Sequence, residues 1–445
     1  MPGAVADTST KIAEKLVAED AHYLAAVTAL GDQQSVLASD DILTATGVKL
    51  IAKGTPIDSR LREKLLGYRL GQNFDQKLTV SNAVSAGSLA NKVDRLITEE
   101  PFWQRLAARS GDPLAMRHGL ARIALPAALA FKLTVMREHR PHLFAHSLRV
   151  AVLAHYLALR LGLDDKNTHH LLLAALCHDL GEMHTDPAIL DPSHRISDAE
   201  RGFVYVHPAT AYVILRDIPG VAPEVARTVL HHHERLDGSG YPSGLDKSRI
   251  TPLALPLMVA DTAESVLHRF ADRGRLSALL RLNQNKYDSR SVGFLHDAIL
   301  AESNTPGHYA EKAPSDRMSQ LLAFSRMLDE WTAFRRTLNA TQLAPGTSGI
   351  GFLHDRLQNL NSLLYQFGFD PGSFDMLIAL SQSDPQVAAE LGQVFDELQY
   401  QLSEIAREID RHGPTFDTVL TDAQQTAFSN WRTSLQETLQ RPVSA

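Results

Sequence analysis

The chain has 445 residues, of which 44% are hydrophobic and 21% charged, and its formal net charge is −7. This composition is typical of a soluble globular protein of two to four domains, and the acidic balance argues against binding to a nucleic acid polymer. Cys177 is the single cysteine, so no disulfide can form within the chain, and neither a signal peptide nor a membrane-spanning stretch is found. We therefore expect a cytoplasmic protein without membrane contact.

Residues 1–80 are expected to form a helix followed by a small β-containing module. Hydrophobic residues recur at helical spacing over residues 8–30. Short apolar runs at residues 36–38 and 48–52 are typical of strands, and a short helix is predicted for residues 58–66. An elaborate helical connector without strands is the alternative.

Residues 81–137 return to helical spacing and are predicted to be a helical connector. The next region, residues 138–305, shows no strand alternation, so we expect an all-α domain there. Pro256 lies inside the last of its predicted helices, which is an unfavourable position for proline. These helices are predicted at residues 141–161, 166–180, 197–215, 223–232 and 252–269.

Residues 306–445 are predicted to form a C-terminal helical domain. One of its helices has apolar residues alternately four and three positions apart, a heptad pattern of fewer than three repeats. We expect this seam to be one side of a helical bundle; a homodimer contact, or a contact with a partner protein, is the alternative. The seam residues are Leu391, Phe395, Leu398, Leu402, Ile405 and Ile409.

The histidines are concentrated in the middle of the chain, where 14 of the 20 lie between His139 and His268. Several stand in apolar helical segments, where an imidazole must find a partner for each ring nitrogen. Taken singly, each has an ordinary structural explanation, such as a surface histidine, a hydrogen-bonded pair or a cap. As a set they offer the imidazoles of His146, His178, His207, His232 and His233 with the carboxylates of Asp179 and Asp261.

This ligand set suits two divalent transition metals with Asp179 between them. Imidazole with carboxylate favours iron or manganese, with zinc also compatible, and argues against calcium or magnesium alone. Two adjacent ions lower the pKa of a bridging water and neutralise phosphate oxygens. The sequence therefore predicts a metal-dependent phosphohydrolase with His178 and Asp179 as its catalytic pair.

The order and spacing of these residues resemble the HD-GYP family of cyclic di-GMP phosphodiesterases, a branch of the HD-domain metal-dependent phosphohydrolases. The resemblance runs from about His139 to Leu300. It rests on His146-Ser147-Leu148-Arg149-Val150, His178-Asp179-Leu180-Gly181, Asp186-Pro187-Ala188-Ile189-Leu190, His207-Pro208, His232-His233-Glu234 with Asp237-Gly238-Ser239-Gly240-Tyr241-Pro242, and Val259-Ala260-Asp261.

The resemblance implies an HD-type catalytic domain that opens the phosphodiester ring of cyclic di-GMP to the linear dinucleotide or to GMP. One metal would be held by His146, His178, Asp179 and Asp261. The second would be held by His207, His232 and His233, with Asp179 shared. The residues expected to line the substrate pocket are Asp237, Gly238, Gly240, Tyr241, Pro242 and Glu182.

Three departures from the family pattern bear on activity. Glu182 stands where the family usually has a lysine, which places an anion beside an anionic substrate. His142 stands where some members have a glutamate that holds a third metal, so the number of metals beyond two stays open. The third is the segment Asp261-Thr262-Ala263-Glu264-Ser265, which differs from the usual Asp-x-x-Asp-Ala and lacks a secure match to the basic residues that follow it.

Two further functions are consistent with the same residues. A catalytically weak or inactive module could bind a cyclic dinucleotide and pass the signal to a partner through the C-terminal helices. A phosphohydrolase for another nucleotide would use the same metal chemistry. The Gly-Tyr-Pro loop favours the cyclic dinucleotide as ligand.

Overall fold

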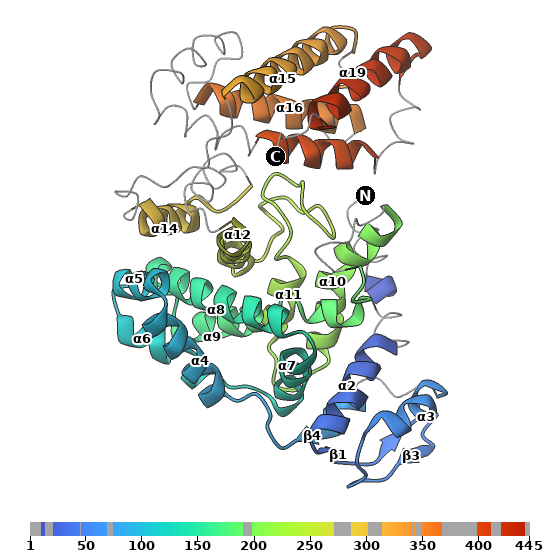
Figure 1. The fold of residues 1–445 in the computed structure, drawn as a ribbon, viewed down its shortest axis with the longest axis vertical. Helices are drawn as coiled ribbons and strands as arrows, with labels where there is room; N and C mark the ends of the chain where they lie inside the picture. Colours follow the sequence, from blue (N-terminus) through green and yellow to red (C-terminus); the bar gives the residue numbers. More distant parts are fainter. Residues whose placement is uncertain are drawn as a thin grey trace. The chain divides into compact units, whose positions relative to one another are not determined.

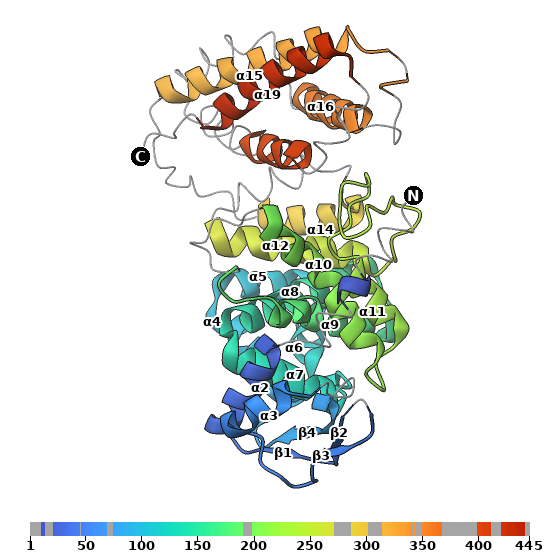
Figure 2. The same ribbon diagram turned by 90° about the vertical axis from the view of Figure 1, so that its right-hand side faces the viewer.

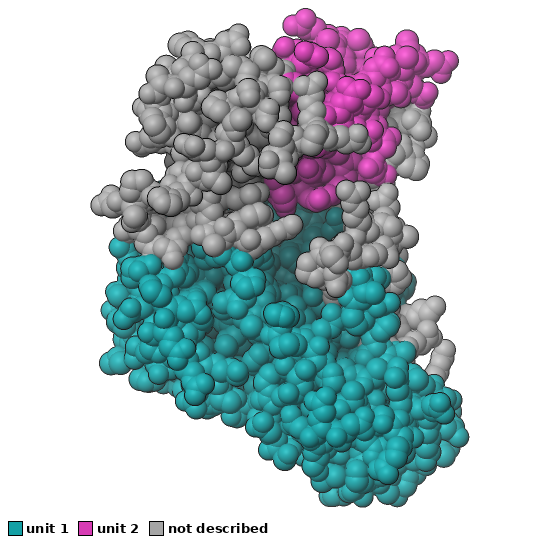
Figure 3. All heavy atoms as spheres, in the orientation of Figure 1, with its two compact units in different colours: residues 1–276, 283–302 teal, residues 277–282, 303–445 magenta. Residues whose placement is uncertain are grey.

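The computed structural model describes residues 10–13, 21–44, 46–68, 74–189, 198–270, 286–300, 314–339, 341–343, 349–366, 398–410 and 420–440. The described chain is mainly helical, with a few short strands, which confirms the expected fold class. It divides into unit 1, residues 1–276 with 283–302, and unit 2, residues 277–282 with 303–445 (Figure 3). Among the described helices, none combines the length and apolarity needed to cross a membrane.

The N-terminal part of unit 1 contains the predicted β-containing module (Figure 1). β1 pairs antiparallel with β4, and β2 pairs antiparallel with β3. Two of these strands, β2 and β4, were not predicted. The elements are α2 (Ala21–Gln33), β1 (Val36–Ala38), β2 (Ile42–Leu43), β3 (Lys49–Ile51), α3 (Arg62–Leu66) and β4 (Leu78–Val80).

A buried polar cluster joins this module to the helices that follow. The Lys132 ammonium of α7 (Ala127–His139) forms an ion pair with Asp75, and Tyr23 of α2 donates a hydrogen bond of 2.7 Å to the same carboxylate. The Tyr23 ring also stacks on His184 at 4.8 Å between ring centroids. Because a buried charge is tolerated only when it is paired, this cluster fixes where the module lies on α7.

The remaining described part of unit 1 is helical and is built around α8. This helix begins at Pro141, ends before Gly162 in left-handed conformation (φ 71°), and packs against α7, α9 and α12 (Figures 1 and 2). Its start and end agree with the prediction, since proline favours a first turn and glycine a C-terminal cap. The described helices are α4 (Ala86–Glu99), α5 (Pro101–Arg109), α6 (Pro113–His118), α7, α8 (Pro141–Leu161), α9 (Asp165–Cys177), α10 (Asp198–Arg216), α11 (Pro223–Leu230), α12 (Ala254–Phe270) and α14 (Ser289–Leu300).

Two of these helices differ from the prediction, and a third contains a proline, in ways that matter for the site. α9 ends at Cys177, so His178 and Asp179 lie at its end instead of inside it. Pro208 lies well inside α10, although proline usually marks a helix boundary. α12 begins at Ala254, which places Pro256 in its first turn, where the missing N–H costs no helix hydrogen bond.

Unit 2 is a helical bundle with a core of its own. The described helices are α15 (Pro314–Arg335), α16 (Gly349–Gln366), residues 398–410 and α19 (Asp422–Gln440). Its core includes Trp331, Trp431 and the seam residues Leu398, Leu402, Ile405 and Ile409. The described part of the seam is therefore packed inside this bundle, as expected; Leu391 and Phe395 lie outside the described residues.

Candidate metal centre

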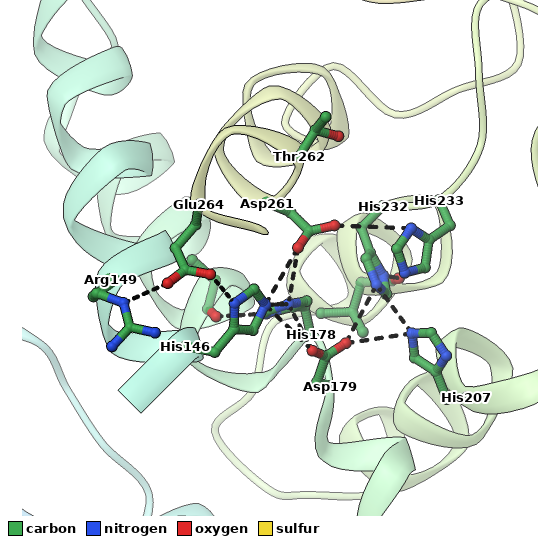
Figure 4. A network of polar contacts seen from close by, with 12 residues as sticks. His146, Arg149, His178, Asp179, His207, His232, His233, Asp261, Thr262 and Glu264 are labelled. Atoms are coloured by element: carbon green, nitrogen blue, oxygen red, sulfur yellow. Dashed lines mark hydrogen bonds and ion pairs between the residues drawn. The ribbon is translucent and has the colours of Figure 1, made fainter. Parts of the chain in front are cut away.

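The seven candidate ligands come together inside unit 1 from five segments of the chain (Figure 4). Their donor atoms form overlapping groups in which every atom lies within 4.8 Å of the others. α8 supplies His146, the end of α9 supplies His178 and Asp179, α10 supplies His207, the segment after α11 supplies His232 and His233, and α12 supplies Asp261.

The first ligand group consists of His146, His178, Asp179 and Asp261. Nε2 of His146 lies 3.2 Å from Nε2 of His178 and 3.3 Å from Oδ1 of Asp261. Oδ2 of Asp179 lies 3.1 Å from Nε2 of His178 and 3.5 Å from Nε2 of His146. Four donor atoms from three segments therefore face one another.

The second ligand group consists of Asp179, His207, His232 and His233. Nε2 of His207 lies 3.2 Å from Nε2 of His232 and 3.3 Å from Oδ1 of Asp179. Nδ1 of His233 also lies 3.8 Å from Oδ2 of Asp261. Asp179 thus turns Oδ2 toward the first group and Oδ1 toward the second, which is the arrangement of a bridging carboxylate.

The donor geometry fits metal ions. Donor atoms bound to one transition metal at about 2.0–2.2 Å lie roughly 2.8–3.6 Å from each other in octahedral or tetrahedral coordination. The separations between donor atoms in the first group run from 3.1 to 3.7 Å. Nitrogen lone pairs facing each other at this distance repel unless a proton or a cation lies between them, so both groups suit a divalent cation.

The ends of helices orient two of the histidines. Nδ1 of His178 donates to the carbonyl of Ala175 at 2.9 Å, and Nδ1 of His232 donates to Val229 at 2.6 Å. Each carbonyl lies in a last helical turn, where the helix itself leaves acceptors unused. With Nδ1 protonated, Nε2 keeps its lone pair for a metal.

A proline leaves free the backbone acceptor that orients His207 inside α10. Pro208 has no N–H, so it cannot complete the helix hydrogen bond to the carbonyl four residues earlier, that of Val204. Nδ1 of His207 donates to this carbonyl at 2.6 Å. The His-Pro dipeptide therefore frees a backbone acceptor that orients its own histidine.

The buried ligand groups differ in ionisation. Burial acts to lower the pKa values of His146, His178 and His207, but the neighbouring carboxylates raise them above the ordinary value, so these rings would release a proton on binding a metal. Burial lowers the pKa of His232 to about 4, so its ring is neutral at neutral pH. Burial acts to raise the pKa of Asp179, but the facing His178, His207 and His232 hold it well below 3.8. A neutral imidazole and an ionised carboxylate are the forms in which these groups bind metals.

The Gly-Tyr-Pro loop lies beside the second ligand group. The Tyr241 ring lies 4.6 Å from the His233 ring and 4.5 Å from the Tyr205 ring, and its N–H donates to the carbonyl of His233. Gly240 is required here because a Cβ would lie 2.3 Å from Cα of Glu234. Gly238, with φ of 78°, makes the left-handed turn that only glycine adopts readily.

The other predicted site residues have distinct surroundings. Glu182 is half-buried, and burial together with the Asp179 carboxylate raises its pKa to about 7. Asp237 accepts hydrogen bonds from Ser239, which shape the loop. His142 is exposed, and no group of metal ligands among the described residues includes it.

Sequence reasoning gave no role to three residues that support the site. Glu264 of α12 pairs with Nδ1 of His146 and with Arg149 (Figure 4). Glu234 is fully buried, and its carboxylate accepts from the N–H groups of Ser243 and Leu245 at 2.8 Å. The i,i+3 spacing of Arg149 after His146, and of Glu264 after Asp261, is the signal that indicates a shared helix face.

Residues 134–290 match the family model described as HD domain. The chain is 37% identical over 123 residues to the cyclic di-GMP phosphodiesterase PA4108 of Pseudomonas aeruginosa, which covers 28% of this chain and 30% of that protein. It is 34% identical over 134 residues to the 3'3'-cGAMP-specific phosphodiesterase 1 of Vibrio cholerae, covering 30% of this chain and 31% of that one. The chain thus spans about a third of the length of these relatives.

A solved structure described as a HDG"Y"P protein from Bdellovibrio bacteriovorus has a TM-score of 0.35 and 16% identity. The comparison covers 60% of this chain and 94% of that one.

Proposed function

We propose that this chain, whose residues 134–290 match the HD domain family model, hydrolyses a phosphodiester bond of a cyclic dinucleotide in a metal-dependent reaction. Cyclic di-GMP is the proposed substrate, and the linear dinucleotide or GMP the product. The observation that carries the proposal is Asp179, whose two carboxylate oxygens face two separate groups of imidazoles.

The ligand residues would hold two divalent cations, with iron or manganese favoured and zinc compatible. When bound, such a pair activates water at neutral pH and neutralises the charge of the phosphate. His146, His178 and Asp261 would hold the first cation, His207, His232 and His233 the second, and Asp179 both.

The neighbouring aromatic side chains would recognise the nucleotide. The rings of His233, Tyr241 and Tyr205 follow one another at 4.6 and 4.5 Å, so a base or ribose beside the second ligand group would meet an apolar wall. Glu234 holds the loop that carries Tyr241, which reduces the cost of ordering that loop when substrate binds.

The names of the relatives favour a second substrate, 3'3'-cGAMP, which shares the cyclic phosphodiester ring. Both substrates would use the same cations and the same aromatic wall. They differ in one base, so the two proposals are separated by relative turnover.

The test uses the full chain, purified without oxygen and supplied with iron or manganese. Metal content is measured on the same sample that is assayed by chromatography with cyclic di-GMP and with 3'3'-cGAMP. We expect turnover of cyclic di-GMP that Asp179→Ala abolishes, because this change removes a ligand from both groups. Asp165→Ala is the matched control, an exposed aspartate in the first turn of the same helix α9, and should change neither metal content nor turnover.

Faster turnover of 3'3'-cGAMP would replace the substrate while keeping the chemistry. Calorimetry that detects binding of cyclic di-GMP by metal-replete protein without turnover of either dinucleotide would reject hydrolysis. It would favour the binding module that Glu182 makes plausible on electrostatic grounds.

A further inference from the structure

His146 differs from His178, His207 and His232 in what holds its Nδ1 atom. Those three donate to backbone carbonyls in the last turn of a helix or four residues before Pro208. His146 lies inside α8, where the preceding carbonyls already accept from the N–H groups of the next turn. It has no spare backbone acceptor, and its Nδ1 contacts the carboxylate of Glu264 instead.

We infer that Glu264, held in place by Arg149, is a positioning residue that controls metal binding at the first ligand group. Glu264 accepts a hydrogen bond from Nδ1–H of His146. The lone pair of His146 is therefore on Nε2, which faces Asp179 and Asp261. A hydrogen-bonded carboxylate also makes the imidazole a stronger ligand. The inference rests on the proposed metal centre and does not depend on the identity of the substrate.

The surroundings of Glu264 support a defined geometry. Glu264 is 2% exposed. One of its carboxylate oxygens contacts Nδ1 of His146, and the other contacts Nε of Arg149. Arg149 balances the buried negative charge, so Glu264 stays ionised and acts only as an acceptor toward His146. The pair therefore specifies which nitrogen of His146 carries the proton.

The same arrangement ties the first ligand group to the packing of two helices. His146 and Arg149 lie one turn apart on α8, and Asp261 and Glu264 lie one turn apart on α12. Nε2 of His146 lies 3.3 Å from the Asp261 carboxylate, and its Nδ1 is held by Glu264, both from α12 (Figure 4). His207 and His232 of the second ligand group take their Nδ1 acceptors from their own segments, so loss of Glu264 should leave that group intact.

The experiment is a titration of metal-free, full-length protein with Mn²⁺ alone, followed by calorimetry and by metal analysis after gel filtration. We expect two ions for the natural chain. Glu264→Ala should weaken one of the two sites by about 10- to 100-fold and leave the other unchanged. Glu264→Gln should weaken metal binding less than Glu264→Ala, because its amide oxygen can still accept a hydrogen bond from Nδ1–H of His146.

Two comparisons establish that the effect passes through His146. His146→Ala should lose the same ion, and adding Glu264→Ala to it should cause no further loss at that site. Glu408→Gln is the matched control. Glu408 forms a largely buried ion pair with Arg356 within unit 2, where the side chains are 11% and 10% exposed. This variant should still bind both ions.

The outcomes separate this inference from the proposed function. If the natural chain binds no Mn²⁺, the metal centre itself is rejected, and this inference with it. If it binds two ions and both Glu264 variants bind two ions equally well, the centre stands and the role of Glu264 is rejected. Equal weakening of both sites would also reject it, because that is the result of a general loss of structure. Should Glu264→Ala not fold, as judged by circular dichroism, Glu264→Gln decides.

Discussion

Among the residues around the metal centre, Glu182 is the least suited to an anionic substrate, because it carries a carboxyl group. Its carboxyl group lies near Asp179, and burial raises its pKa to about 7. Bound cations would offset the charge of the ligand carboxylates. No group of metal ligands among the described residues includes Glu182. We therefore expect Glu182 to limit substrate affinity and not metal binding.

Replacement of Glu182 by lysine tests this expectation. The change Glu182→Lys should lower KM for the cyclic dinucleotide about three- to tenfold, the effect of about 1 kcal/mol of charge–charge interaction, with two metals still bound. Glu182→Gln should give an intermediate value. KM and kcat are measured by chromatography, with metal content determined on the same samples.

Glu99→Lys is the matched control, because Glu99 is exposed at the end of α4 and the change alters net charge equally. An equal fall in KM for this control would attribute the effect to net charge. An unchanged or higher KM for Glu182→Lys would contradict a repulsive role for Glu182.

At the scale of elements, the ends and breaks of helices place the ligands. His178 follows α9, His232 follows α11, and His207 precedes the proline inside α10. In each case a backbone carbonyl at a helix end or before a proline orients the ring. The 3-10 helix Leu180–His184 then packs on α10 so closely that a Cβ on Gly181 would lie 2.1 Å from the carbonyl oxygen of His207.

This close approach predicts that Gly181→Ala damages the centre. The added methyl group must push apart the segments that carry Asp179 and His207, at a cost of about 1–3 kcal/mol in free energy of unfolding. The second ligand group should bind metal more weakly as a result. Urea unfolding of the metal-free chain and Mn²⁺ titration measure the two effects.

Gly293→Ala provides the comparison, because Gly293 lies inside α14 and a Cβ there would meet nothing within 4 Å. Alanine is the better helix former, so this variant should be as stable as the natural chain or up to about 1 kcal/mol more stable. Unaltered stability and metal binding in Gly181→Ala would show that the two segments can separate without cost.

At the scale of the whole molecule, the candidate ligands all belong to unit 1, while unit 2 has its own aromatic core. A metal that binds only the folded form stabilises it by about 2.7 kcal/mol at a concentration one hundred times its Kd. Binding should therefore stabilise the unit that holds the centre and leave the other unit unaffected.

The three tryptophans allow this to be measured. Trp103 lies in α5 of unit 1, and Trp331 and Trp431 lie in the core of unit 2. In Trp103→Phe, fluorescence reports unit 2 alone, and its Tm should not move when metal is removed with a chelator. Calorimetry of the same protein should show a second transition that falls on chelation. A common shift of both signals would mean that the units unfold together.

Much of the site could be predicted from the sequence because its ligands occur as compact motifs. Histidine and aspartate are costly to bury without a partner. The pairs His178-Asp179 and His232-His233 in apolar surroundings could therefore be recognised from the sequence as candidate ligands. The caps of α8 were likewise predicted, since proline and glycine act on the backbone locally. The mainly α fold follows from the same local periodicities.

The tertiary structure alone decided which side chains face each other. Glu264 meets His146 across 118 positions of sequence. The close approach of Gly181 to the carbonyl of His207 is likewise a contact between segments that sequence spacing does not reveal. Sequence spacing determines what a helix face offers, whereas the packing of one helix on another determines what that face meets.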